Sequence, residues 1–322
     1  MLIRHLKGWE IPERSVSPES VYLTRRKFLK SIGLATLGTA VGCHRSSADS
    51  ATREGQIRGI PAASPTADLY PPRRNESFTL DRPITPEVVA STYNNFYEFS
   101  EHKKAAGLLA EQLTTRPWTI KVTGLVQNPQ IFDIDSLVRK MPLEERLYRH
   151  RCVEAWAMAV PWTGFPIRAL MELVQPLSSA KYIRMVTFND PKTAPGMRNT
   201  SYPWPYHEGL TIAEAANDLS LFVTGIYGHE LTKQHGAPIR LVAPWKYGYK
   251  SIKSIVELEF VAERPPTFWS TLIPWEYNFG ANVNPKIPHP RWSQASERLI
   301  GTNIRRATLD YNGYGPFVSD LY

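Results

Sequence analysis

The chain has 322 residues, of which 42% are hydrophobic and 11% aromatic, so it can bury one large core or two small ones. This composition excludes a disordered protein. The formal net charge is +8, but half of that excess lies in the first 43 residues. The remainder is too weakly basic to indicate nucleic-acid binding, and no DNA- or RNA-binding motif is present.

The N-terminal segment has the layout of an export signal. The basic stretch Thr24-Arg25-Arg26-Lys27-Phe28-Leu29-Lys30 precedes a mildly apolar run, residues 31–42, that is too short to span a bilayer. Adjacent arginines followed by Phe-Leu-Lys match the twin-arginine signal, with a chance basic helix as the alternative. We expect residues 1–43 to be a twin-arginine leader and the protein to be periplasmic, exported in the folded state with a cofactor already inserted.

The end of this leader leaves two processing routes open. Ala40-Val41-Gly42-Cys43 resembles a lipoprotein site but lacks the usual leucine, so either Cys43 is lipid-anchored or cleavage falls after it. Neither route leaves Cys43 available for a disulfide. Residues 44–83 begin with His44-Arg45-Ser46-Ser47 and read as a flexible tether, which leaves 84–322 as the folded domain.

The folded domain is predicted to be α+β and mostly β. The 27 prolines, 15 tyrosines and 9 tryptophans of the whole chain favour short strands and turns over a helical bundle. Alternating or apolar runs predict strands at 118–126, 182–188, 221–224 and 255–261. Helices are predicted at 137–140, capped by Asp133 or Asp135 and ended by Pro142, and at 167–174 and 210–216.

Two segments combine structural and ligand-binding signals. Asn94 and Asn95 interrupt an aromatic run at 92–99, so these amides either cap a turn or face a ligand. Further on, a glycine-containing loop carries Lys246, Lys250 and Lys253. Such a loop is either an anion site or simply a solvated surface.

Cys152 is the cysteine most informative about chemistry. In an exported protein it has no disulfide partner, so it is either an inert buried side chain or a working thiol. Arg149, His150 and Arg151 precede it directly. Nearby positive charge favours the thiolate, which attacks electrophiles and binds soft metals.

Several other chemistries have no signature in the chain. There is no nucleotide-binding phosphate loop, no Cys-x-x-Cys, no His-Glu-x-x-His and no zinc spacing among the eight histidines. A cysteine hydrolase pairing Cys152 with a distant histidine stays open as an alternative without a family signature.

The sequence motifs around Cys152 resemble those of a known family. Arg151-Cys152-Val153-Glu154-Ala155-Trp156 and the following Val160-Pro161-Trp162-Thr163-Gly164-Phe165-Pro166 are similar to the catalytic subunits of bacterial periplasmic protein-methionine-sulfoxide reductases, in the sulfite-oxidase superfamily of molybdopterin proteins. The resemblance extends over about 84–315 and includes 93–99, 142–146, Gly236-Ala237-Pro238 with Arg240, 244–248, 263–267, 282–285 and 289–295.

The resemblance implies a single sulfite-oxidase-like molybdopterin-binding domain with one Mo-molybdopterin per chain. Cys152 would be the metal ligand, with Asn95 and Glu154 beside the metal on the substrate side. The residues matched to the pterin and its phosphate are Asn94, Tyr97, Glu98, Thr187, His235, Arg240, Ser251, Ile252 and Lys253. His235 and Ser251 stand where some members have Asn and Gly, and both can still hydrogen-bond a cofactor, His235 through its ring and Ser251 through its main-chain N–H.

The implied reaction is oxygen-atom transfer from methionine sulfoxide in oxidised periplasmic proteins to molybdenum. Glu154 is the candidate for passing protons. Electrons would come from a haem-containing membrane subunit, and the chain would otherwise be a monomer. One alternative is a reductase of small sulfoxides or N-oxides on the same fold, and a sulfite-oxidising enzyme is favoured less. Another alternative is a metal-free exported binding protein.

Overall fold

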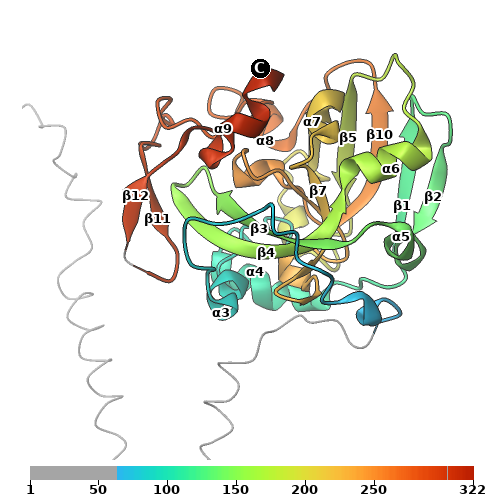
Figure 1. The fold of residues 1–322 in the computed structure, drawn as a ribbon, viewed down its shortest axis with the longest axis horizontal. Helices are drawn as coiled ribbons and strands as arrows, with labels where there is room; N and C mark the ends of the chain where they lie inside the picture. The colour runs from blue at the N-terminus through green and yellow to red at the C-terminus, as the bar shows by residue number, and fades with distance from the viewer. Residues whose placement is uncertain (1–63, 303) are drawn as a thin grey trace, which may run out of the picture. The chain divides into compact units, whose positions relative to one another are not determined.

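Two β-sheets lie at the centre of the computed structural model, which describes residues 64–302 and 304–322 (Figure 1). The smaller sheet has the order β2-β1-β10-β5-β6, in which only β1 and β10 pair in parallel. Its strands are β1 (Thr119–Gly124), β2 (Gln130–Asp133), β5 (Tyr182–Thr187), β6 (His207–Thr211) and β10 (Ile255–Val261).

The larger sheet has the order β12-β11-β4-β7-β8, with β3 also paired to β4 and β9 to β7. Every residue of β4 except Pro166 is buried, as expected for a strand covered on both faces. The strands are β3 (Glu144–Arg151), β4 (Trp156–Pro166), β7 (Leu221–Ile226), β8 (His229–Glu230), β9 (Arg240–Val242), β11 (Ser296–Leu299) and β12 (Arg305–Ala307).

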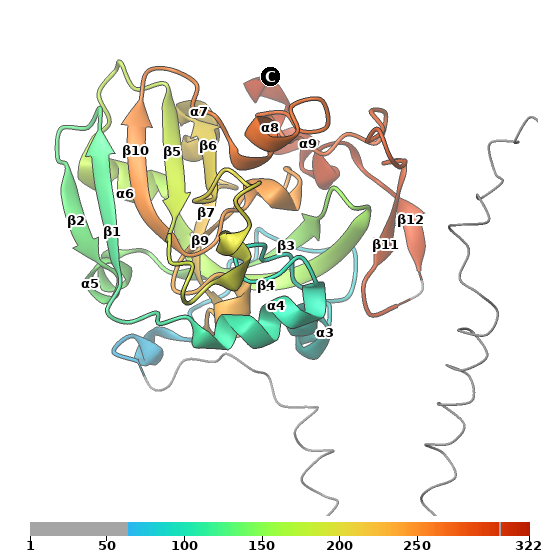
Figure 2. The same cartoon turned by 180° about the vertical axis from the view of Figure 1, so that it is seen from behind.

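Short helices surround the sheets. In both views α3 and α4 lie below the β3–β4 hairpin, and α8 and α9 lie above it (Figure 1, Figure 2). The α-helices are α3 (Glu87–Thr92), α4 (Lys103–Leu109), α5 (Ile134–Lys140), α6 (Ile167–Val174), α7 (Ile212–Ala216), α8 (Phe268–Leu272) and α9 (Gly315–Val318). The 3-10 turns are η2 (Ala67–Leu69), η3 (Ala110–Gln112), η4 (Pro195–Arg198), η5 (Lys233–His235), η6 (Gly248–Lys250), η7 (Asp310–Gly313) and η8 (Ser319–Leu321).

Local sequence signals account for most of these elements. The Asp133 carboxylate caps α5 by accepting from the Ser136 N–H at 2.9 Å, as predicted. The helix α6 has the predicted bounds, and the predicted strands appear as β1, β5, β7 and β10. The helix predicted at 210–216 begins only at Ile212, because residues 207–211 pair with β5 as β6. A mostly β, α+β single domain is confirmed.

The boundary predicted at residue 84 was wrong for the residues that the structure describes. Residues 64–83 pack on the domain: Thr66 is fully buried, its hydroxyl donating to Glu230 at 2.6 Å, and the Asn75 N–H donates to the Glu145 carbonyl at 2.8 Å. The sequence misled because this segment is rich in proline and polar residues. The predicted leader, 1–43, and the first part of the predicted tether, 44–63, lie outside the described residues.

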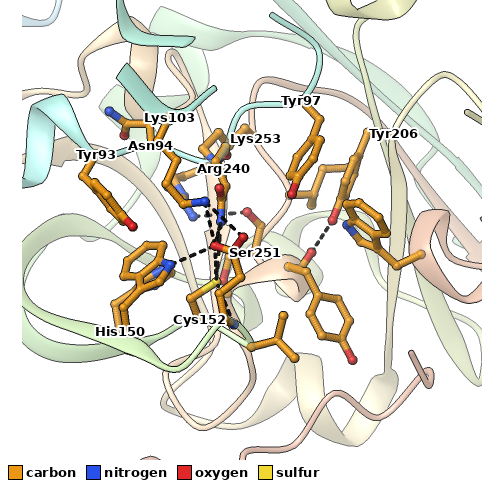
Figure 3. Close-up of a pocket in the computed structure, with 18 of the residues that line it drawn as sticks. Tyr93, Asn94, Tyr97, Lys103, His150, Cys152, Tyr206, Arg240, Ser251 and Lys253 are labelled. Carbon is orange, nitrogen blue, oxygen red and sulfur yellow. Dashed lines mark hydrogen bonds and ion pairs between the residues drawn. The ribbon is translucent and has the colours of Figure 1, made fainter. Parts of the chain in front are cut away.

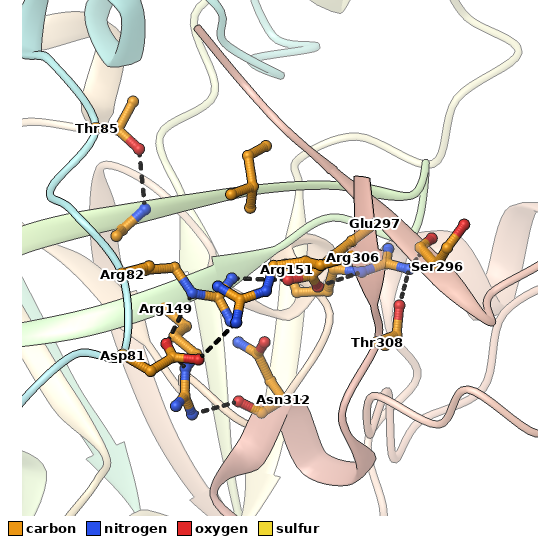
Figure 4. Close-up of polar contacts among 12 residues, drawn as sticks. Asp81, Arg82, Thr85, Arg149, Arg151, Ser296, Glu297, Arg306, Thr308 and Asn312 are labelled. Carbon is orange, nitrogen blue, oxygen red and sulfur yellow. Dashed lines mark hydrogen bonds and ion pairs between the residues drawn. The ribbon is translucent and has the colours of Figure 1, made fainter. Parts of the chain in front are cut away.

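A buried ion-pair cluster joins the ends of the domain (Figure 4). Arg82 donates to Glu297 at 2.7 Å, and their side chains are 3% and 1% exposed. The other Glu297 oxygen lies 3.2 Å from Arg151, which is fully buried. Asp81 extends the cluster to the surface by pairing with Arg149 and Arg306, each at 3.0 Å. The segment before α3 is thus tied to β3 and β11.

Among residues 64–302 and 304–322, no helix combines the length and the apolar character needed to cross a membrane.

We expect Glu297→Ala to lower the free energy of unfolding by about 3–5 kcal/mol, because it leaves Arg82 and Arg151 buried without their shared carboxylate. Asp218→Ala is the control: it breaks an exposed pair with Arg168 and should cost about 1 kcal/mol or less. Urea unfolding followed by circular dichroism measures both. Equal losses in the two variants would contradict the role given to the buried cluster.

Candidate active site

A cavity of about 470 Å³ lies among the β3–β4 turn, the loop before α4, the segment from η5 to β10, and α8 (Figure 3). This volume falls within the roughly 300–1,000 Å³ typical of cofactor and ligand sites. Its walls combine one thiol, several buried cations and many aromatic rings, among them Tyr93, Tyr97, His150, Cys152, Trp156, Trp162, Arg240, Lys253, Trp269, Tyr277 and Trp292.

Cys152 begins the tight turn between β3 and β4. Its N–H donates to the Trp156 carbonyl at 2.9 Å, and the Ala155 N–H donates to the Cys152 carbonyl at 3.0 Å. Ala155 adopts a φ of 61°, a left-handed conformation that is unfavourable for a residue with a side chain. The turn therefore holds a strained shape with the sulfur at the cavity wall.

Neighbouring segments hold this turn from outside. The Val153 carbonyl accepts from the Trp292 ring N–H and from the Gln294 amide, both at 2.7 Å. Arg151 donates to the Cys152 carbonyl. The position of the sulfur is thus determined by residues far along the chain as well as by the hairpin.

The environment of the thiol differs from the prediction. Burial raises the pKa of Cys152, and the charge of Glu154 raises it further. The guanidinium groups of Arg149 and Arg151 pair with Asp81 and Glu297 instead, and burial lowers the pKa of His150 to about 3, which leaves its ring neutral. Of the three residues predicted to favour the thiolate, Arg151 does lower the pKa of Cys152, but burial and the charge of Glu154 outweigh it and the net pKa is raised. Ionisation of this thiol needs a new positive partner, such as a metal ion.

Glu154 and Asn95 form a polar group beside the sulfur. Glu154 accepts from the Asn95 amide at 3.0 Å, from the Trp156 ring at 2.9 Å and from Lys103 at 3.0 Å. Burial raises the pKa of Glu154, but these contacts outweigh it and the net pKa is lowered, so the carboxylate is ionised at neutral pH. The Asn95 amide also lies 3.5 Å from the Cys152 sulfur. The structure brings all three predicted catalytic residues together.

Two buried cations face the other part of the cavity. Arg240 donates to the carbonyls of His235 at 2.9 Å and Ser251 at 3.1 Å, and Lys253 donates to the Asn95 carbonyl at 2.6 Å. Within the described ranges, neither has a carboxylate at ion-pair distance. Burial, together with the charge of Arg240, lowers the pKa of Lys253 to about 7. The charge of the buried Glu98 opposes the shift of Lys253, but burial raises the pKa of Glu98 itself to about 7, so this region can still accept a further anion.

The other two lysines of the glycine-containing loop are neither anion ligands nor solvated. Lys246 pairs with Glu214 at 2.5 Å and Lys250 with Glu208 at 2.7 Å, and both lysine side chains are 0% exposed. Both interpretations of this loop, an anion site and a solvated surface, were therefore wrong for Lys246 and Lys250. Only Lys253 reaches the cavity.

Most of the predicted cofactor-binding residues line the same cavity. These are Asn94, Tyr97, Glu98, His235, Arg240, Ser251, Ile252 and Lys253. Burial raises the pKa of Glu98 to about 7. Thr187 is the exception: it is buried beneath the wall and donates to the Lys253 carbonyl at 2.8 Å, so it holds the loop rather than facing the cavity. The His235 ring is bound to Thr232 at 2.6 Å.

Sequence reasoning missed several wall residues. His150 lies two residues before Cys152, and strand alternation could have placed both side chains on one face. Its ring occupies the space beside Gly248, where an added Cβ would meet the imidazole at 2.8 Å. Trp162 and Trp292 also line the cavity, and no local sequence signal predicted this. The buried ring N–H of Trp162 has no partner in the described structure.

Comparison with known proteins agrees with this arrangement. Residues 107–269 match the oxidoreductase molybdopterin binding domain. The chain is 44% identical over 321 residues to the protein-methionine-sulfoxide reductase catalytic subunit MsrP of Burkholderia mallei, covering 98% of this chain and 94% of that protein. It is also 44% identical over 330 residues to the MsrP of Pseudomonas syringae pv. tomato, covering 100% and 97%. The chain belongs to the MsrP family.

One solved structure is also similar in part. The sulfane dehydrogenase SoxCD from Paracoccus pantotrophus gives a TM-score of 0.44 with 15% identity, covering 70% of this chain and 56% of that chain.

The cavity fits the molybdopterin cofactor that this family domain binds. The partnerless Asn95 oxygen and Trp162 ring N–H can bind polar groups of a pterin, and Arg240 and Lys253 suit its phosphate. Among the described residues, no three His, Cys, Asp or Glu side chains cluster as metal ligands.

We expect Lys253→Met to separate cofactor binding from folding. It removes a buried cation that has no carboxylate at ion-pair distance and interacts only at longer range with the buried Glu98, so molybdenum content should fall several-fold while the cofactor-free protein loses far less stability than a variant that breaks a buried ion pair. Lys250→Met is the matched control: it isolates the buried Glu208 and should cost about 3–5 kcal/mol of unfolding free energy. Metal analysis and urea unfolding of both variants test this.

The same variant carries a pH signature. Between pH 7 and about 10.5, the unfolded wild type binds a proton at Lys253 that the folded state does not, so wild-type stability from this group rises with pH. Any excess stability of Lys253→Met in the cofactor-free state should therefore shrink across that range. An excess that grows with pH would contradict the burial of an unpaired ammonium group.

Proposed function

We propose that this chain is the catalytic subunit of a molybdenum-dependent reductase of methionine sulfoxide in periplasmic proteins. The observation that carries the proposal is the near full-length similarity to MsrP catalytic subunits, together with an unpaired thiol at the wall of a cavity suited to molybdopterin. The family and the cofactor-binding domain are established by comparison.

The protein's first task is to hold the cofactor. Arg240 and Lys253 supply positive charge for its phosphate, Ser251 and Ile252 supply main-chain groups, and Asn94 supplies a side-chain amide. Cys152 supplies a sulfur ligand, and proximity to the metal offsets the burial that otherwise keeps this thiol protonated. The bound molybdenum cofactor supplies the oxygen-atom transfer and the two-electron redox chemistry.

The protein's second task is to orient the sulfoxide. Tyr97, Trp269 and Tyr277 make consecutive ring contacts with centroid separations of 5.0 Å, and this wall suits the apolar methyl thioether end of methionine. The Asn95 amide, held by Glu154, is a hydrogen-bond donor beside Cys152. Glu154 connects Asn95 to Lys103, whose side chain is 22% exposed, and so occupies the position of a proton relay from solvent.

The proposal also covers export and electron supply. The Arg25-Arg26 motif supports twin-arginine transport to the periplasm, with Cys43 as a lipid-anchor candidate. The relatives are named as catalytic subunits, and this supports a second subunit as electron donor. We propose that this donor is a haem-containing membrane protein fed by quinones.

The decisive experiment compares wild type with Cys152→Ser, both purified from a host that makes molybdopterin. Wild type should contain about one molybdenum per chain and reduce methionine sulfoxide in an oxidised protein with an artificial electron donor. Cys152→Ser should fold normally and lose this activity by several orders of magnitude. Reduction of dimethyl sulfoxide without reduction of oxidised protein would favour a small-sulfoxide reductase, and metal-free wild type would favour a binding protein.

Export has its own test. We expect Arg25→Lys with Arg26→Lys to retain folded, molybdenum-loaded protein in the cytoplasm, because the adjacent arginines are the recognised element of the signal. Cell fractionation with antibody detection measures this, and Arg14→Lys serves as the control substitution. Unchanged periplasmic accumulation of the double variant would exclude the twin-arginine route.

A further inference from the structure

The size of the cavity restricts how a protein substrate can approach. About 470 Å³ must take both the cofactor and the reacting group, which leaves little room for more than a methionine sulfoxide side chain. The residues on either side of that methionine must therefore lie across the rim. The rim is the part of the site in which protein-bound and small sulfoxides differ.

One part of the rim exposes an unusually large apolar side chain. Ile273 and Tyr277 both line the cavity, and Trp275 lies between them in the turn after α8, where the residue is 74% exposed. Solvent exposure of so large an apolar side chain is unfavourable, and tryptophan is enriched in binding interfaces. A tryptophan at the rim of an active-site cavity is therefore a candidate contact residue.

This exposure does not result from a loose turn. The Ile273 carbonyl accepts from the N–H groups of Glu276 at 3.1 Å and Tyr277 at 3.2 Å, and the Ile273 N–H donates to the Trp269 carbonyl at 2.8 Å. Trp275 is thus presented by a turn whose main chain is hydrogen-bonded on both sides. A side chain held in this way can contact a ligand with little further ordering of the backbone.

A second turn adds to the same wall. Glu276 pairs with Arg291 at 2.7 Å and lies 3.3 Å from His289, whose ring stacks on Trp292 at 3.8 Å. Because Trp292 also holds the Val153 carbonyl, this wall is connected to the Cys152 turn. Two residues before His289, Ile287 is 65% exposed.

Most charges around the rim are paired within the protein. Glu276 is paired with Arg291 and Glu154 with Lys103, whereas Glu101 keeps its charge and accepts a hydrogen bond from the Tyr202 hydroxyl at 2.7 Å. The described rim therefore offers little net charge to an acidic or basic partner. It offers apolar contact, which suits the uncharged, apolar residues that a protein exposes in flexible or unfolded segments.

We propose that Trp275 and Ile287 form a docking surface for apolar residues next to methionine sulfoxide in a flexible segment of a substrate protein. The inference rests on the proposed function and adds a sequence preference to it. It assigns recognition of the peptide to the rim and reduction of the sulfoxide to the cavity. Trp275 does not line the cavity, so small sulfoxides reach the site without it.

The test uses the molybdenum-loaded enzyme and two fluorescent peptides, each with one central methionine sulfoxide, flanked by leucines in one peptide and by serines in the other. Binding is measured by fluorescence anisotropy without an electron donor, so that no turnover occurs. Turnover is then measured with reduced methyl viologen, and dimethyl sulfoxide serves as the small substrate. This donor replaces the membrane partner, so a contact with that partner cannot affect the result.

The variants are Trp275→Ala and Ile287→Ser, each with a matched control. Phe317→Ala removes an aromatic ring that is 63% exposed on a separate cavity sharing no lining residue with the first, and Ile131→Ser changes a 66% exposed residue of β2. Trp275→Ala should weaken binding of the leucine-flanked peptide and lower its kcat/KM about tenfold, as for an aromatic contact residue in an interface. Reduction of dimethyl sulfoxide and both controls should stay within about twofold of wild type.

Equal loss for the leucine-flanked peptide and dimethyl sulfoxide would overturn the inference, because it would mean that the turn supports the cavity itself. Unchanged binding and turnover in Trp275→Ala would also overturn it, as would equal affinity of wild type for the two peptides. Failure of the proposed function looks different: wild type would then reduce dimethyl sulfoxide but neither peptide.

Discussion

The fixed position of the Cys152 sulfur is the constraint on which the rest of the site depends. A strained turn between β3 and β4 places this thiol, and Trp292, Gln294 and Arg151 hold the main chain of the turn from outside. Burial keeps the thiol protonated until a positive partner arrives. The same packing that makes it a poor free nucleophile makes it a well-positioned metal ligand, since no ordering is left to be done when the metal binds.

The distribution of charge separates structural from functional residues. Lys246, Lys250 and Arg151 are fully buried, yet each has a carboxylate partner, so these charges belong to the architecture of the domain. Arg240 and Lys253 are buried beside the cavity with main-chain carbonyls as their hydrogen-bond acceptors. An uncompensated buried charge is unfavourable in the empty fold, and a bound phosphate would relieve that cost. The charges of Arg240 and Lys253 therefore reduce the stability of the cofactor-free domain at the place where the cofactor binds.

The sequence could predict elements whose signals are local. Alternation identified β1, β5 and β10, the capping role of Asp133 located α5, and flanking prolines bounded α6. Relations across the chain were not predictable in this way. The local sequence does not distinguish Lys246 and Lys250 from Lys253. Only the fold places Glu214 beside Lys246 and Glu208 beside Lys250. The ordered path of 64–83 was missed for the same reason, because Arg82 finds Glu297 more than two hundred residues later.

The site itself was predictable mainly through resemblance. From composition alone, Cys152 could equally have been an inert buried side chain, whereas the motifs around it assigned Asn94, Asn95, Glu154 and Arg240 to one place, and the structure brings them to one cavity. Resemblance did not indicate how the thiol is tuned. The adjacent arginines suggested a thiolate, but side chains at neighbouring strand positions point to opposite faces of the sheet. Arg149 therefore pairs with Asp81, and Arg151 pairs with Glu297.

The central claim is that Cys152 is a ligand of molybdenum held in this cavity. X-ray absorption at the molybdenum edge, on wild type and on whatever fraction of Cys152→Ser retains the metal, tests that claim most directly. The account predicts that the variant loses one sulfur neighbour of molybdenum and gains a lighter one, with the other sulfur neighbours unchanged. An identical sulfur environment in the two proteins would show that Cys152 does not bind the metal and would contradict the account.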